Sequence, residues 1–137
     1  MLGHLIHGEK TDWIARARKC LAQGDEKKFE KFDRFAQFEE SKGKTMTQLL
    51  AEFRQARVAN LKSLDEMNLT EADLESVGIH PSFGEVTLKQ LLSTWVAHDL
   101  DHLIQISRVM AKQYYDEVGP WMRYMRVMQP LQRYEQQ

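Results

Sequence analysis

Trp95-Val-Ala-His98-Asp-Leu-Asp-His102 is the segment of this 137-residue chain that says most about its fold class and chemistry. Apolar residues spaced by three and four predict a long helix from about Leu88 to Tyr115. Residues four apart lie one above the other on a helix, so the two histidines share one side of it. At about 100° per residue, that side is also the apolar face that should pack into a core.

Two imidazole rings on a core-facing stripe need polar partners. Burying a polar group without a partner costs roughly 1–3 kcal/mol. A metal ion shared by both rings would satisfy them, and so would hydrogen bonds to neighbouring helices. The spacing of the histidines leaves both explanations open.

The composition excludes several classes of protein. The net charge of −1 offers no electrostatic basis for binding nucleic acid or an anionic membrane. A single cysteine, Cys20, excludes an internal disulfide and a zinc site built on paired cysteines. No apolar run approaches the roughly 20 residues that span a bilayer, and no signal peptide is visible. We therefore expect one soluble, cytoplasmic domain over residues 1–137.

The helical segments predict an all-α, up-down bundle with long crossover connections. Capping boxes, in which Ser or Thr precedes Glu or Gln by three residues, occur at Thr45–Gln48 and Thr87–Gln90. The helices are expected over residues 2–22, 45–67, 88–115 and 121–129, with a short turn after Thr70 that Gly78 ends. Pro130 stops the last helix, and the residues from Leu131 to Gln137 are expected to fray.

The connection over residues 23–44 is long for a compact domain, and such loops are often functional. It carries four phenylalanines at a spacing of three: Phe29, Phe32, Phe35 and Phe38. We favour the interpretation that these rings anchor the crossover to the bundle. The alternative is that some of them line a pocket above the histidines.

Three further polar residues also have an ordinary interpretation that we favour. Arg54 and Arg57 fall mostly off the apolar stripe of their helix, which predicts solvated surface. His80 precedes Pro81, which restricts it to an extended backbone. We interpret His80 as a loop histidine, and the alternative is a residue that lines a pocket.

Four segments closely resemble the DinB/YfiT-like superfamily: His4-Leu-Ile-His-Gly-Glu9, His80-Pro-Ser-Phe-Gly84, Thr87-Leu-Lys-Gln-Leu-Leu92 and Trp95-Val-Ala-His98-Asp-Leu-Asp-His102-Leu-Ile-Gln105. The resemblance covers nearly the whole chain. Its most specific part is the last segment, with tryptophan, two histidines and glutamine. It implies a four-helix bundle that holds a divalent metal ion on three histidines.

Carried over to this chain, the resemblance implies that His4, His98 and His102 are the metal ligands. His4 matches the family position, but helical phase alone does not choose between it and His7. Three neutral imidazoles bind zinc, nickel, iron or manganese and leave coordination positions open. Zinc or nickel is the metal that we expect. Asp99 and Asp101 flank the pair and would support it only through a neighbouring residue.

Family members with known activity are similar to hydrolases or S-transferases that use low-molecular-weight thiols. The resemblance therefore implies a metal-dependent enzyme of one of these types, with such a thiol or another small molecule as its substrate. No side chain stands out as a general base. Glu9 is the weak candidate, and its ordinary interpretation is a carboxylate on the helix surface.

One departure from the family concerns the start of the chain, because another helix usually precedes the segment that begins here at Met1. One side of the first helix would then be bare, and a large exposed apolar patch favours self-association. We therefore expect a homodimer in which two chains complete the bundle.

Two alternatives remain open. The first is a non-enzymatic, dimeric stress-related or binding protein with a structural or vestigial metal site. The second is a bundle whose two histidines are hydrogen-bonded core residues, with Met122, Met125 and Met128 as a partner-binding surface.

Overall fold

The computed structural model describes residues 1–130, and it confirms a mostly helical fold. The chain divides into two compact units, of which the first is Met1–Trp95 and the second begins at Val96. The predicted fraying near Gln137 lies outside the described residues. Within those residues, no helix is long and apolar enough to cross a membrane.

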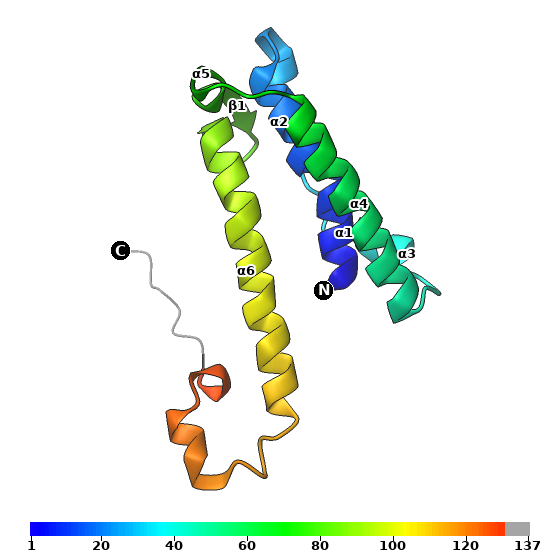
Figure 1. Cartoon of the computed structure of the whole chain (residues 1–137), viewed down its shortest axis with the longest axis vertical. Helices are drawn as coiled ribbons and strands as arrows, with labels where there is room; N and C mark the ends of the chain where they lie inside the picture. The colour runs from blue at the N-terminus through cyan, green and yellow to red at the C-terminus, as the bar shows by residue number, and fades with distance from the viewer. Residues whose placement is uncertain (131–137) are drawn as a thin grey trace. The chain divides into compact units, whose positions relative to one another are not determined.

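The first unit holds most of the secondary structure (Figure 1). Its elements are α1 (Leu2–Thr11), α2 (Trp13–Leu21), the 3-10 helix η1 (Gly24–Lys27), α3 (Ala36–Glu40), α4 (Met46–Glu66), α5 (Glu71–Leu74), β1 (Val77–His80), β2 (Gly84–Thr87) and the first turns of α6 (Leu88–Lys112). The second unit contains the rest of α6 and the 3-10 helices η2 (Gly119–Tyr124) and η3 (Arg126–Met128).

The first predicted helix is interrupted at Asp12, where α1 ends and α2 begins. Asp12 has φ −103° and ψ −72°, although its N–H still donates to the Gly8 carbonyl at 2.9 Å. The Thr11 hydroxyl donates to the His7 carbonyl at 2.8 Å, a local bond that competes with regular helix geometry. The pattern of apolar residues over 2–22 contains no signal for this side-chain bond, so the interruption was not predicted.

Both predicted capping boxes are present. Thr45 and Gln48 exchange side-chain and backbone hydrogen bonds at the start of α4. At the start of α6, the Thr87 N–H donates to Gln90 Oε1 at 2.9 Å, and the Gln90 N–H donates to Thr87 Oγ1 at 3.1 Å. These bonds satisfy donors that a helix N-terminus leaves without partners.

A β-hairpin follows α5 and was not predicted. Strands β1 and β2 pair antiparallel, with His80 opposite Gly84, whose φ of +74° suits a tight turn. The crossover adds to this hairpin, because the Phe29 N–H donates to the Ile79 carbonyl at 2.8 Å beside a parallel bridge. Four-residue strands are too short to show the alternation that identifies a strand in a sequence.

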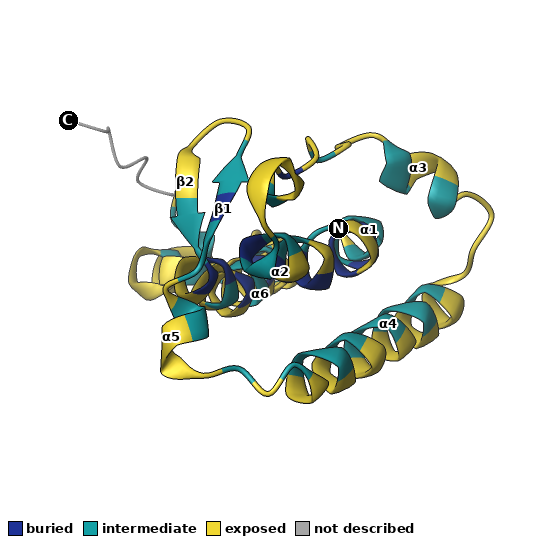
Figure 2. Cartoon of the chain, turned by 90° about the horizontal axis from the view of Figure 1, so that it is seen from above, coloured by how far each residue is buried: buried dark blue, intermediate teal, exposed yellow. Residues whose placement is uncertain are grey.

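The core of the first unit lies between α2, the hairpin and the first turns of α6. Its buried residues are Trp13, Ile14, Ala17, Cys20, Phe29, Leu88, Leu91 and Trp95. The rings of Trp13 and Trp95 stack with centroids 5.7 Å apart. A Cβ at Gly78 would overlap the Phe29 ring, so only glycine fits there. By contrast, α4 contains no buried residue, as Figure 2 shows.

Within the described residues, the second unit has 3-10 helices in place of the predicted α-helix over 121–129. Helix α6 ends at Lys112, and Pro120 lies at the start of η2, where its missing N–H costs little. Arg108 Nη2 donates to the Gln129 carbonyl at 2.6 Å. Gln129 Nε2 donates to the Met122 carbonyl at 2.8 Å, so these contacts tie the two 3-10 helices to α6.

Candidate metal centre

His98 and His102 lie together on α6 within the second unit. Their Nε2 atoms are 3.1 Å apart, and their rings meet edge to face with centroids 4.4 Å apart. The spacing of four residues produces this arrangement, because side chains at i and i+4 stand over one another.

The separation of these two nitrogens fits a shared metal ion. Imidazole nitrogens bind zinc at about 2.0–2.1 Å. Two such ligands at angles between 90° and tetrahedral lie about 2.9–3.4 Å from each other. A hydrogen bond between the rings would give a similar distance, so the protonation of the other ring nitrogens matters.

Gln105 fixes the proton on the ring of His102. Gln105 Nε2 donates to Asp101 Oδ2 at 2.8 Å, which turns the amide oxygen of Gln105 towards His102 Nδ1 at 3.1 Å. That oxygen can only accept, so the Nδ1 atom carries the hydrogen, and in the neutral ring Nε2 is then the nitrogen that can ligate a metal. A metal-ligating histidine commonly has such a partner. Asp101 thus acts on His102 through a neighbouring residue, as expected, and that neighbour is Gln105. The sequence did not predict this role for Gln105.

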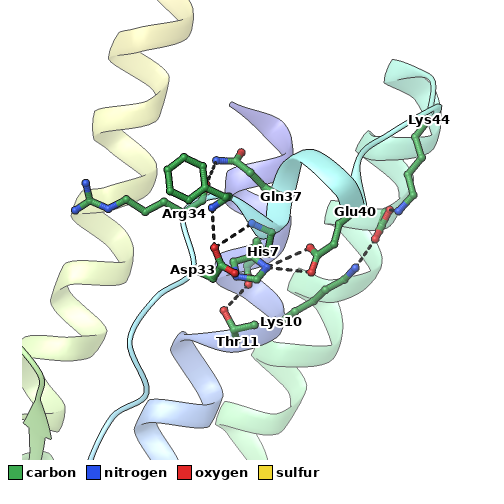
Figure 3. A network of polar contacts seen from close by, with 11 residues as sticks. His7, Lys10, Thr11, Asp33, Arg34, Gln37, Glu40 and Lys44 are labelled. Atoms are coloured by element: carbon green, nitrogen blue, oxygen red, sulfur yellow. Dashed lines mark hydrogen bonds and ion pairs between the residues drawn. The ribbon is translucent and has the colours of Figure 1, made fainter.

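The predicted third ligand, His4, lies on α1 in the first unit and is half-buried. Its ring meets Phe32 edge to face, with centroids 5.3 Å apart. His4, His98 and His102 each offer one ring nitrogen as a possible metal ligand. His7 is more deeply buried and already has a carboxylate partner, since its Nδ1 lies 3.1 and 3.2 Å from the two oxygens of Glu40 (Figure 3). The choice of His4 stays a prediction.

Glu9 is a buried carboxylate, which corrects its interpretation as a helix-surface group. Its side chain is only 1% exposed and accepts from Arg57 Nη2 at 2.8 Å, Asn60 Nδ2 at 2.9 Å and Trp95 Nε1 at 3.0 Å. These three donors come from α4 and α6, so Glu9 joins both helices to α1. With its oxygens engaged in this way, Glu9 is a structural residue and no longer a candidate base.

The two arginines of α4 therefore differ. Arg54 is exposed, as predicted, whereas the prediction of solvated surface for Arg57 is wrong. A prediction from the apolar stripe uses only the apolar residues of a helix. It therefore gives no sign that an arginine beside the stripe reaches a buried carboxylate.

The four phenylalanines of the crossover also divide. Phe29 lies in the core, and Phe32 lies against both His4 and His7. Phe35 and Phe38 are 76% and 66% exposed. The anchoring interpretation holds for Phe29, and Phe32 contacts one of the predicted ligands, whereas the other two rings are mostly exposed.

His80 is the last residue of β1 and not a loop residue, but it serves the fold, as the favoured interpretation had it. Its Nδ1 accepts from the N–H groups of Ser82 and Phe83 at 3.1 and 3.2 Å, and its ring stacks on Phe83. Burial, and then the positive charge of Arg16, lower the pKa of His80 from its ordinary value. The ring therefore acts as a neutral acceptor that closes the hairpin turn.

Cys20 is fully buried in the core. Burial raises the pKa of its thiol, because an apolar environment disfavours the thiolate. The thiolate is the reactive form of cysteine, so this side chain is a core residue and no nucleophile.

A family model of the DinB superfamily matches residues 1–106 of the chain. The chain belongs to the DinB superfamily. The match includes α1 with His4 and the part of α6 with His98, His102 and Gln105. No curated protein matches the chain. The resemblance that the sequence showed is thereby confirmed, and this DinB protein carries histidines suited to hold a metal ion.

Proposed function

We propose that this DinB protein holds a divalent metal ion on His4, His98 and His102 and acts as a hydrolase or a thiol-dependent S-transferase. The observation that carries the proposal is the 3.1 Å separation of the His98 and His102 Nε2 atoms. The Gln105 amide oxygen supports it, because it keeps the His102 proton on the opposite nitrogen. Membership of the DinB superfamily supports the third ligand.

Three neutral imidazoles suit zinc or nickel and also accept iron or manganese. When bound, such an ion supplies Lewis acidity and an open position for the substrate. The chain's only cysteine is buried away from such a role. In a thiol transfer, the thiol would therefore come from a low-molecular-weight substrate.

Metal content tests the site directly. We expect one equivalent of metal in the wild-type protein, purified without a nickel column, and its loss in His98→Ala and His102→Ala. His80→Asn is the matched control, because His80 serves the hairpin turn. A wild-type protein that takes up no zinc, nickel or manganese on reconstitution would contradict the proposal and leave the α6 histidines as structural residues.

A non-enzymatic protein with a structural metal site is the rival. A structural zinc site is closed by a fourth protein ligand and contributes to folding. We expect the opposite here, namely that a chelator removes the metal and leaves the helical circular dichroism nearly unchanged. Unfolding on chelation would favour the rival.

We also propose that the protein is a homodimer. Val96, Leu100, Leu103 and Met110 on α6 are all more than half exposed, and their spacing of four, three and seven residues is that of a coiled-coil seam. A second copy presents the same seam, so two α6 helices can cover one another about a two-fold axis. Light scattering should give twice the chain mass, and less after Leu103→Glu. A stable wild-type monomer at micromolar concentration would contradict this proposal.

A further inference from the structure

Phe32 is wedged between two histidine rings of α1. It meets His4 at a centroid distance of 5.3 Å and an interplanar angle of 77°, and His7 at 5.0 Å and 68°. Edge-to-face packing of this kind favours particular ring orientations. The contact therefore limits how the His4 ring can turn about its side-chain bonds.

Two further contacts hold the crossover against α1. His7 Nδ1 pairs with the Glu40 carboxylate on α3, and Figure 3 shows this pair beside the ion pairs that link Lys10 and Lys44 to α4. At the other contact, a Cβ on Gly3 would overlap the Ser41 hydroxyl, so α1 and the end of α3 approach closely next to His4. These two contacts fix the crossover after Phe32, and the bond from the Phe29 N–H to the Ile79 carbonyl ties the segment before Phe32 to the hairpin.

We propose that Phe32, His7 and Glu40 are positioning residues for His4, an inference that rests on the proposed metal site. A metal ligand that swings freely loses conformational entropy when it binds the ion. A ring already held by Phe32 loses less, so the metal binds more tightly. Glu40 acts indirectly. It holds His7, and the Phe32 ring packs against both His7 and His4.

The test is metal affinity, measured by competition with a chromophoric chelator, together with the visible spectrum of the cobalt(II) protein. Substituting a residue that orients a metal ligand typically weakens metal affinity about 10–100-fold. We expect Phe32→Leu to weaken zinc binding at least about 10-fold and to shift the cobalt spectrum. Phe35→Leu is the matched control, because Phe35 lies on the same crossover and is 76% exposed.

Glu40 provides a second variant that leaves the aromatic contact residues in place. We expect Glu40→Ala to weaken metal binding, and Glu40→Gln to restore it, because the amide oxygen can still accept from His7 Nδ1. If the substitutions acted only by lowering the overall stability, Glu40→Gln would weaken metal binding as much as Glu40→Ala does. Equal affinities for Glu40→Ala and the wild type would contradict the role of the His7–Glu40 pair.

The metal-free protein supplies a separate readout. Nuclear Overhauser contacts between the His4 and Phe32 rings should be present in the wild type and in Phe35→Leu, and their absence there would contradict the inference. The His4 ring protons should change their chemical shifts in Phe32→Leu but not in Phe35→Leu, because only the first substitution removes the neighbouring ring current. If the wild type binds metal and Phe32→Leu binds it equally well, the inference fails while the proposed function stands. If the wild type binds no metal on reconstitution, the proposed function fails and the positioning role fails with it.

Discussion

The Nε2 atoms of His98 and His102 face one another at 3.1 Å, one helical turn apart on α6. A ligand that binds only the folded state raises the free energy of unfolding, by about 2.7 kcal/mol at 100 times its dissociation constant. We therefore expect zinc at such a concentration to raise the free energy of unfolding, measured with urea, by about 2.7 kcal/mol. His98→Ala should abolish this increase. An equal increase in that variant would place the metal elsewhere.

Gln105 should control the affinity of the same site. Gln105→Leu keeps the size of the side chain but cannot accept from His102 Nδ1, so the His102 ring loses the bond that fixes its tautomer. We expect metal binding to weaken about 10–100-fold. Nitrogen-15 spectra of the metal-free protein should show the proton of His102 moving between its ring nitrogens. Gln113→Leu, an exposed substitution just after α6, should leave both measurements unchanged.

Glu9 should be one of the most sensitive positions in the first unit. Glu9→Ala leaves Arg57, Asn60 and the Trp95 indole N–H without their shared acceptor. Removing one partner of a buried ion pair costs about 3–5 kcal/mol. We expect a loss of that size in the free energy of unfolding, measured with urea.

The other arginine of α4 is the control for this prediction. Arg54 is exposed, so Arg54→Ala should change the free energy of unfolding by no more than about 0.5 kcal/mol. Arg57→Ala should lower the free energy of unfolding less than Glu9→Ala but clearly more than Arg54→Ala. Asn60 and Trp95 still donate to the buried carboxylate, but its charge partner is gone. Similar small effects for Arg54→Ala and Arg57→Ala would contradict the buried ion pair.

His80 should make stability fall in acid. Burial and Arg16 hold its pKa in the folded protein below the ordinary value of 6.5. The unfolded chain therefore binds the proton first as the pH drops, and the free energy of unfolding decreases from pH 6.5 down to the folded pKa. His80→Asn keeps an acceptor for the Ser82 and Phe83 N–H groups but does not titrate. The difference in stability between variant and wild type should change over this pH range, and a constant difference would contradict the assignment.

The sequence predicts those features of the fold and of the site in which a residue's partner lies only a few positions away. The capping boxes of Thr45 and Thr87 need only a residue three positions later, so the order of the amino acids is enough to recognise both. The facing of His98 and His102 follows from helix geometry for the same reason.

Features that depend on distant partners were missed. The ion pair of Glu9 and Arg57 joins residues 48 positions apart, and neither residue type signals burial by itself. The hairpin of β1 and β2 became evident only from its pairing and from the bridge that the crossover makes with it. Gln105 was noticed as part of a motif, but its role depends on the orientation of an amide, which a sequence pattern does not contain.

The stacked pair of Trp13 and Trp95 has a consequence for synthesis of the chain. Trp13 lies near the start of the first unit's sequence and Trp95 at its end. Helix α2 therefore leaves the ribosome long before Trp95, which covers it, has been synthesised. Contacts so far apart in sequence form late, and apolar surface exposed in the meantime is prone to aggregate. A nascent chain stalled before Trp95 should therefore expose Trp13 and Ile14 and bind chaperones, whereas one extended past α6 should not.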